Sequence, residues 1–143
     1  MTEAPAKRRI LAVAGLIISE GQVLLSQRRD GQSLAHQWEF PGGKIEPGES
    51  PRRALVRELH EELGVSVRVG RIWDALYHDY NDFELILLVY PCELDTGQVP
   101  QCIDVQAISW CAPSELGNYN ILRADRPLVK RLIGEGLPLC TTV

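Results

Sequence analysis

Two apolar runs near the start of the chain predict a β-hairpin. Residues 10–18 form one run, residues 23–25 form the other, and Glu20-Gly21 between them suits a tight turn. Lys7-Arg8-Arg9 ahead of the first run resembles the charged start of a signal peptide, but nine apolar residues are too few to cross a bilayer and no cleavage pattern follows. We therefore interpret the two runs as paired strands that follow a disordered tail over residues 1–8.

The clearest helix of the chain is predicted in its middle. Trp38-Glu39-Phe40 is typical of a short strand, and a turn-like segment rich in Gly and Pro follows it. Ser50 is a favourable helix cap, Pro51 suits the first helical position, and Gly64 is a favourable left-handed terminator. These signals predict a helix over residues 50–63.

The second half of the chain is predicted to be mostly strand. Segments rich in β-branched and aromatic residues predict strands at residues 65–69, 71–77, 83–92 and 107–111. A short helical turn is expected near residue 112, and a last helix is expected from Asp125 to about Gly134.

This order of elements predicts one mixed domain. Strands interleaved with a few helices are typical of the α/β or α+β class. With 143 residues, 45% of them hydrophobic, the chain can build one core of its own, and it contains no repeat or linker. We place the domain at residues 9–136 and a C-terminal tail at residues 137–143.

Charge and cysteine content argue against several classes of protein. Fifteen Lys and Arg against nineteen Asp and Glu give a net charge of −4, which disfavours stable binding to nucleic acid. No apolar segment is long enough to suggest a membrane protein. The four cysteines contain no CxxC pair and no neighbouring histidine cluster, so we expect reduced thiols, no zinc and a cytoplasmic location.

Three carboxylates crowd one face of the predicted helix. Glu58 lies three positions before Glu61 and four before Glu62, and like charges at these spacings repel. The last turn of a helix also disfavours anions, so local stability does not explain this arrangement. Either the acids form a solvated face that nearby arginines neutralise, or they serve a chemical purpose.

The loop before the helix favours the chemical purpose. Gly42-Gly43 allows a backbone carbonyl to approach a cation closely. Three carboxylates and one carbonyl make an all-oxygen site suited to Mg²⁺ or Mn²⁺, which commonly also binds the phosphates of a substrate.

The same residues fit a known sequence motif. The chain matches the Nudix box, G-x5-E-x7-R-E-U-x-E-E-x-G-U with U aliphatic, at every specified position. The matching residues are Gly43, Glu49, Arg57, Glu58, Leu59, Glu61, Glu62, Gly64 and Val65. Similarity extends to Gln27-Arg28, to residues 38–43 and to Ala124-Asp125. The chain therefore resembles the Nudix hydrolases, and within them the MutT branch and its cytidine-triphosphate pyrophosphohydrolase subgroup.

The resemblance implies a Nudix fold, which is a mixed β-sheet sandwiched between α-helices, and a metal site. Glu58, Glu61, Glu62 and the Gly42 carbonyl would hold Mg²⁺, for which Mn²⁺ can substitute. Among the catalytic residues, Glu58 and Glu61 would act at the metal, and Glu58 would also orient or deprotonate the attacking water. Arg57 would steer Glu58 and pair with Glu49.

The resemblance also implies a substrate site. Arg28 would contact phosphate, Glu39, Phe40 and Gly43 would border the substrate, and Asp125 would read the base. Asp125 has an alternative interpretation as the cap of the last helix. Asp104 lies where the MutT branch often has a catalytic glutamate; its side chain is one methylene shorter, so it is either catalytic or an ordinary loop acid.

Two more sets of residues keep an ordinary interpretation. Tyr80 and Phe83 are expected to pack on the strands, with the border of a base pocket as the alternative. His36, His60 and His78 are interpreted as residues of loops, turns and surfaces, without a role as ligand or base.

The resemblance finally implies an activity. It is the hydrolysis of nucleoside triphosphates to monophosphate and diphosphate, with 8-oxo-dGTP or another modified nucleotide, or (d)CTP, as substrate. The alternatives are another substrate with a linked diphosphate, such as a dinucleoside polyphosphate, a nucleotide sugar or a capped RNA, or a domain that binds nucleotides without cleaving them. A small nucleotide is the expected partner, and the chain is expected to be a monomer or a homodimer.

Overall fold

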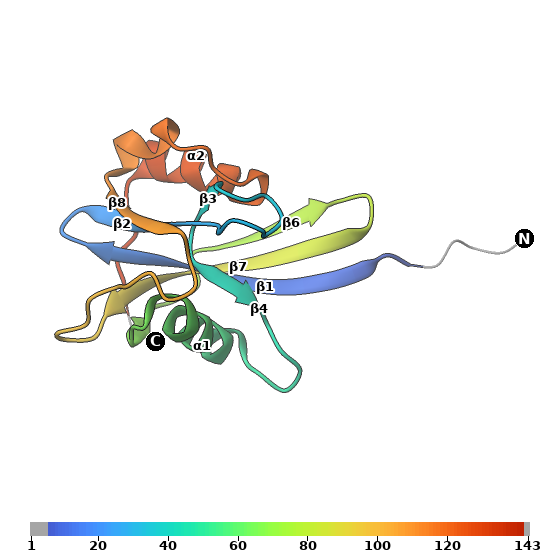
Figure 1. Cartoon of the computed structure of the whole chain (residues 1–143), viewed down its shortest axis with the longest axis horizontal. Helices are drawn as coiled ribbons and strands as arrows, with labels where there is room; N and C mark the ends of the chain where they lie inside the picture. Colours follow the sequence, from blue (N-terminus) through green and yellow to red (C-terminus); the bar gives the residue numbers. More distant parts are fainter. Residues whose placement is uncertain (1–5, 142–143) are drawn as a thin grey trace, which may run out of the picture.

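The computed structural model describes residues 6–141 and contains eight strands and two α-helices, arranged as Figure 1 shows. The strands are β1 (Arg8–Ser19), β2 (Gln22–Gln27), β3 (Trp38–Glu39), β4 (Gly42–Lys44), β5 (Val67–Val69), β6 (Asp74–Asp79), β7 (Phe83–Leu94) and β8 (Ala107–Cys111). The helices are α1 (Pro51–Leu63) and α2 (Arg126–Glu135), with the 3₁₀ turns η1 (Pro113–Asn118) and η2 (Arg123–Asp125) ahead of α2.

The sheet is mixed and is organised around the long strand β1. β1 pairs in parallel with β7 and antiparallel with β2 and β4. β5 and β6 extend the sheet beyond β7, while β3 and β8 extend it beyond β2. The predicted class, a mixed sheet with helices packed around it, is confirmed.

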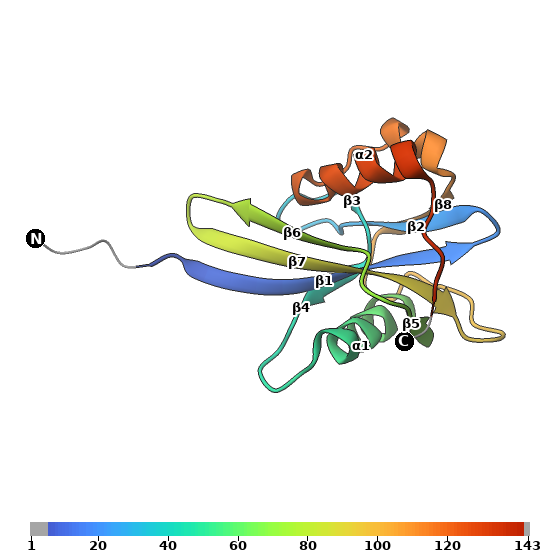
Figure 2. The ribbon, with the colours of Figure 1, turned by 180° about the vertical axis from the view of Figure 1, so that it is seen from behind.

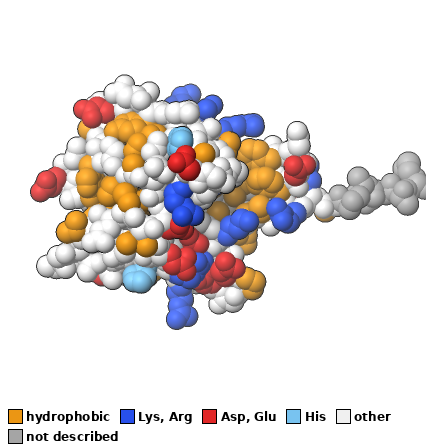
Figure 3. Space-filling model, viewed as in Figure 1, with side chains coloured by type: hydrophobic (Ala, Val, Ile, Leu, Met, Phe, Trp, Pro, Cys, Tyr) orange, Lys and Arg blue, Asp and Glu red, His pale blue; other side chains and the backbone are white. Residues whose placement is uncertain are grey.

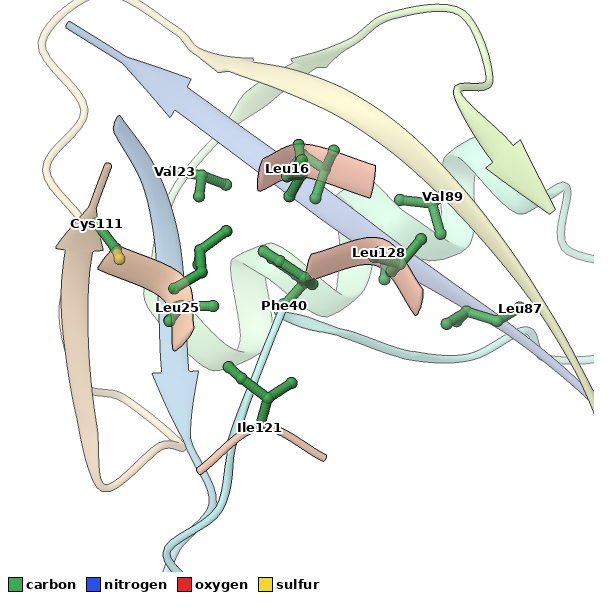
Figure 4. Close-up of a cluster of buried hydrophobic side chains, with 12 residues drawn as sticks. Leu16, Val23, Leu25, Phe40, Leu87, Val89, Cys111, Ile121 and Leu128 are labelled. Carbon is green, nitrogen blue, oxygen red and sulfur yellow. The ribbon is translucent and has the colours of Figure 1, made fainter. Parts of the chain in front are cut away.

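Each face of the sheet carries one helix, α1 on one side and α2 on the other (Figures 1 and 2). Along β1, Val13 and Ile17 pack with the buried leucines of α1, whereas Leu16 packs with Leu128 of α2. Figure 4 shows Leu16, Phe40 and Leu128 together in this second cluster. Because both faces of β1 are buried, its sequence is a nearly continuous apolar run rather than an alternating one.

The helix α1 forms as its sequence signals predict. The Ser50 hydroxyl accepts a hydrogen bond from the Arg53 N–H at 3.2 Å, and Gly64 closes the helix in the left-handed region at φ 68°. Leu55, Leu59 and Leu63 are fully buried against the sheet. This packing fixes which way the acidic residues of the helix point.

The segment after Phe40 has the composition of a turn but contains β4, which pairs with residues 12–14 of β1. This pairing requires glycine, because a Cβ at position 42 would lie 2.0 Å from the Val13 carbonyl oxygen. The expectation of a turn is therefore wrong here, since the turn-like composition concealed a strand.

Several predicted boundaries differ from the structure. β1 begins at Arg8, because it pairs with Phe83, so the expected disordered tail is too long; residues 1–5 of that tail lie outside the described residues. β6 begins at Asp74 rather than at residue 71, because the Arg71 N–H instead donates to the Thr141 carbonyl at 3.0 Å. The C-terminal segment thus packs back on the domain through residue 141.

All four cysteines are free thiols. Among residues 6–141, no helix is long and apolar enough to cross a membrane.

Candidate active site

A cavity of about 210 Å³ brings together residues from six elements and the loops between them. Its floor is apolar and is built from β1 and β7 by Ala12, Ala14, Leu85 and Leu87. The residues from the predicted site that line it are Arg28, Glu39, Phe40, Gly42, Gly43, Glu62, Asp104 and Asp125. An apolar floor bordered by a few charged groups suits a ligand with a flat organic ring and a charged end.

Glu62 brings a carboxyl group with a buried, unpartnered oxygen to this cavity. Its Oε2 atom is buried and has no hydrogen-bond partner within the described part of the chain. Burial raises the pKa of Glu62 to about 9, with further increases from the nearby carboxylates of Glu39 and Glu58. An unpaired buried carboxylate is costly, so this position favours either a proton or a cation.

Arg57 organises the other acids of the Nudix box. Its Nε and Nη2 atoms donate to the two carboxylate oxygens of Glu49 at 2.6 and 2.9 Å, which is the predicted pair. Hydrogen bonds from Arg57 and from the Glu46 N–H lower the pKa of Glu49 to about 2. Nη1 of Arg57 also donates to Glu58 at 2.9 Å and to Glu61 at 3.3 Å. One guanidinium therefore contacts three carboxylates.

The solvated-face interpretation is wrong for two of the three helix acids. The Glu58 side chain is only 16% exposed, and Oε2 of Glu62 is buried, while Glu61 is 55% exposed. Figure 3 shows acidic and basic side chains crowded together where Figure 1 places β4 and α1.

Gly43 connects this cluster to the cavity. A Cβ at position 43 would lie 2.4 Å from the Glu58 carboxyl carbon and 2.5 and 2.6 Å from its two oxygens. The carboxylate can therefore lie against β4 only because residue 43 has no side chain. Gly43 itself lines the cavity, so Glu58 lies directly behind the cavity wall.

The donor set fits a hard divalent cation. Carboxylates and a carbonyl are the ligands that such ions prefer, and the Glu62 Oε2 atom, which has no hydrogen-bond partner among the described residues, is free to bind a cation in place of a proton. As they stand, no three His, Cys, Asp or Glu side chains within residues 6–141 converge into a metal site. The contacts of Arg57 with Glu58 and Glu61 account for part of this, because they hold two of the carboxylates on the guanidinium.

Arg28 has a protein partner at the edge of the cavity. It donates to the Glu39 carboxylate at 3.1 Å and to the Ser33 carbonyl at 2.9 Å. Burial raises the pKa of Glu39, and Arg28 partly offsets this increase. A phosphate that binds Arg28 would therefore share the guanidinium with Glu39.

Asp125 does not cap the last helix. It has helical backbone angles, φ −94° and ψ −10°, and its side chain makes no capping hydrogen bond. Its Oδ2 atom instead accepts the Phe40 N–H at 2.8 Å, and the side chain is 5% exposed at the wall of the cavity. Burial raises the pKa of Asp125 to about 7. The ring of Phe40 is itself buried in the core, so its backbone is what serves the site.

Asp104 lines the cavity, but its carboxylate pairs with a residue that does not line the cavity. Its carboxylate pairs with Arg29 at 3.1 Å and is 55% exposed, and its N–H donates to the Glu62 carbonyl at 3.0 Å. The sequence did not single out Arg29 or the floor residue Leu85, although Ala124 was part of the resemblance. Leu85 looks like an ordinary core residue of a strand, and Arg29 like an ordinary loop cation, so no local signal marks either residue.

Comparison with known proteins agrees with this geometry. The NUDIX domain family model matches residues 8–132. The chain is 38% identical over 123 residues to CTP pyrophosphohydrolase of Escherichia coli (strain K12), a match that covers 86% of this chain and 90% of that protein. It is 43% identical over 130 residues to 8-oxo-dGTP diphosphatase of Haemophilus influenzae, covering 90% of this chain and 95% of that protein.

Solved structures give the same result. The MutT protein from Methanosarcina mazei Go1 superposes with a TM-score of 0.81 at 26% identity, covering 94% of this chain and all of that one (100%). The E. coli ORF135 protein superposes with a TM-score of 0.74 at 36% identity, covering 92% and 94%. Fold and site together define a Nudix hydrolase, and the chain belongs to the Nudix family. Within that family it is MutT-like. Nudix hydrolases generally need a divalent metal ion.

Proposed function

We propose that this protein hydrolyses nucleoside triphosphates to the monophosphate and diphosphate, with Mg²⁺ as cofactor and Mn²⁺ able to substitute. One observation carries the proposal. A single cavity holds an apolar floor, the buried Asp125 at its wall, and Glu62, whose Oε2 atom has no hydrogen-bond partner among the described residues. These groups match the base and the metal-bound phosphates of a nucleotide.

The residues divide between metal binding and positioning. Glu58, Glu61, Glu62 and the Gly42 carbonyl would hold the ion, which when bound would neutralise phosphate charge and promote ionisation of water. Glu58 would accept a proton from the attacking water, and its raised pKa, caused mainly by burial, suits a base. Arg57 would keep Glu58 in place, Arg28 would bind phosphate, and Asp104 would approach the same region from the loop.

Asp125 is the residue that we propose to read the base. An ionised carboxylate only accepts hydrogen bonds and suits the adjacent N–H donors of guanine or 8-oxoguanine. A protonated acid also donates, and so suits the ring nitrogen of cytosine. Because burial raises the pKa of Asp125 to about 7, both forms are accessible near neutral pH. This supports 8-oxo-dGTP and (d)CTP as substrates, in line with the names of the relatives.

A substrate panel tests the proposed activity. Diphosphate release is measured from CTP, dCTP, dGTP, 8-oxo-dGTP and dTTP in Mg²⁺, Mn²⁺ and chelator. Release of the nucleotide products is measured under the same conditions from a nucleotide sugar, a dinucleoside polyphosphate and a capped RNA as competitors. We expect metal-dependent release from triphosphates. Faster cleavage of a competitor, or tight nucleotide binding without cleavage, would overturn the proposal in favour of the corresponding alternative.

Asp125→Asn tests the reading of the base. The amide oxygen can still accept the Phe40 N–H, so the fold should survive, but one acceptor becomes a donor. We expect kcat/KM for the best base to fall by about 1.5–3 kcal/mol, the scale of a hydrogen bond to a charged group, with a much smaller loss for poor bases. Equal loss on every base, or none, would contradict this role.

The pH dependence of base preference follows from the same residue. As the pH falls through about 7, Asp125 gains a proton, so the ratio of kcat/KM for CTP to that for 8-oxo-dGTP should rise. The Asn variant does not titrate and should show a flat ratio. A wild-type ratio that falls or stays constant between pH 8 and pH 6, a window spanning about one unit on each side of this pKa, would argue against the assignment.

A further inference from the structure

We propose that His78 is a positioning residue that sets base specificity by holding the η2 turn against the hairpin of β6 and β7. This role rests on the proposed function, because it acts through the Asp125 carboxylate. His78 itself does not line the cavity, and it lies outside the catalytic helix.

The contact that carries this inference is a hydrogen bond between β6 and η2. Nε2 of His78 lies 2.9 Å from the carbonyl oxygen of Ala124, in a half-buried position. A carbonyl only accepts, so Nε2 carries the hydrogen and donates it. Ala124 immediately precedes Asp125, and both residues line the cavity. The bond therefore fixes the peptide from which the Asp125 side chain projects.

The turn has little internal support of its own. η2 has three residues and no side-chain cap, and its backbone hydrogen bonds run from the Asp125 N–H to the Leu122 carbonyl at 3.0 Å and from the Arg126 N–H to the Arg123 carbonyl. On one side β3 and the residue after it hold the turn: the Leu122 N–H donates to the Trp38 carbonyl at 2.9 Å, and the Phe40 N–H donates to Asp125. On the other side, the hairpin of β6 and β7 contacts the turn.

A second contact from the same hairpin supports the residue before Ala124. The guanidinium of Arg123 lies over the Tyr80 ring, 5.3 Å from its centroid, and Tyr80 stacks on Phe83 with centroids 4.9 Å apart. Tyr80 and Phe83 are absent from the cavity lining, so the packing interpretation is the one the structure supports. Figure 2 shows the end of β6 near the segment that leads into α2. Two successive residues before Asp125 are thus held by this hairpin.

The geometry separates base reading from catalysis. Glu58, Glu61 and Glu62 of the Nudix box come from α1, which covers the face of the sheet opposite α2, the helix that η2 leads into. If the bond from His78 is lost, the Ala124 carbonyl loses its donor and the turn can shift, which misplaces Asp125. The carboxylates of α1 should be unaffected, so base discrimination should change while kcat does not.

Two substitutions test this role by removing and restoring the donor. His78→Phe keeps a ring beside Tyr80, 6.0 Å away between centroids, but has no N–H, whereas His78→Gln retains a donor. We expect His78→Phe to raise KM for the best nucleotide about tenfold, the effect of losing one neutral hydrogen bond, and to narrow the preference for that base at unchanged kcat. His78→Gln should restore most of the wild-type KM and most of the base preference. His78→Leu replaces His78→Phe if the larger ring prevents folding.

A control on the same hairpin excludes a general loss of structure. Tyr77→Phe removes the hydrogen bond from Tyr77 to Glu84, and Tyr77 alternates with His78 and so lies on the opposite face of the sheet. This variant should match the wild type in KM, kcat and base preference. Equal loss on all bases, a fall in kcat, or no recovery in His78→Gln would overturn the proposal.

Hydrogen exchange separates this inference from the proposed function. His78→Phe should speed exchange of the amides at residues 124–126 relative to wild type, Tyr77→Phe should not, and His78→Gln should restore protection. Unchanged exchange in His78→Phe would refute the positioning role even in an active enzyme. Faster exchange in a protein that cleaves no nucleoside triphosphate would retain the role and reject the activity. In an Asp125→Asn background, His78→Phe should not change base preference further.

Discussion

Replacing Glu62 with glutamine is expected to lower kcat by about 100-fold or more while leaving the fold intact. The change removes one negative charge from the proposed metal site with almost no change in shape. A metal ion at a phosphate contributes several kcal/mol to the reaction, and each 1.4 kcal/mol corresponds to a factor of ten in rate. Steady-state kinetics at saturating Mg²⁺ would measure the loss. Glu115→Gln, the same change at an exposed site outside the cavity, should retain full activity.

Without metal, Glu62→Gln is expected to raise the thermal stability of the protein, although the same change lowers kcat. Its pKa in the folded protein, about 9, lies above the ordinary value of 4.5, so the native state binds the proton more tightly than the unfolded chain does. In chelator, the free energy of unfolding of the wild type should therefore fall as the pH rises from about 5 to 9. Glu62→Gln has no group that titrates at this position, so its free energy of unfolding should not show this fall. At pH 8 the variant should melt about 3 °C or more above the wild type, a shift of about 1 kcal/mol. A lower melting temperature would mean that Glu62 is structural.

Two adjacent glycines are expected to give opposite results when each is replaced by alanine. At position 43 the new methyl group would overlap the Glu58 carboxylate, at 2.4 Å from its carboxyl carbon. That carboxylate ends a flexible side chain and can move away, so the protein should fold but lose activity by about 100-fold, because the base and metal ligand is displaced. At position 42 the methyl group would lie 2.0 Å from the Val13 carbonyl, which is backbone and cannot move without breaking the pairing of β1 with β4.

Thermal melts and kinetics on the same preparations distinguish these outcomes. Gly42→Ala should melt well below the wild type, and Gly43→Ala should melt close to it. Gly134→Ala is the matched control, since nothing lies within 4 Å of its new methyl group and alanine suits its position in α2. An active Gly43→Ala enzyme would show that Glu58 does not need its place against β4.

The helix α1 could be predicted from the sequence because its causes are local. The Ser50 cap, Pro51 and the Gly64 terminator act within a few residues of the helix ends, and the structure contains the helix with those caps. The spacing of Glu58, Glu61 and Glu62 also follows from helical geometry alone. The same is true of the Nudix box, because its match depends only on residue types and their spacing along the chain.

The burial of each acid could not be predicted in this way. Glu61 and Glu62 are neighbours in one helix, yet Glu61 is half exposed and Glu62 has a buried, unpaired oxygen. The difference arises because Gly42, Glu39 and Asp104 approach Glu62 from other parts of the chain. Solvent and the surrounding charges, not residue type, decide which acid can hold a cation or a proton.

By itself, therefore, the sequence determined the family, the mixed fold and the helix that carries the acids, since short-range propensity and residue spacing control them. Only the tertiary structure decided that β4 is a strand, that Arg28 pairs with Glu39, and that Asp125 faces a cavity instead of capping α2. The bond from Phe40 to Asp125 joins residues 85 positions apart. Contacts of that range depend on how the sheet and helices pack, and no local pattern records them.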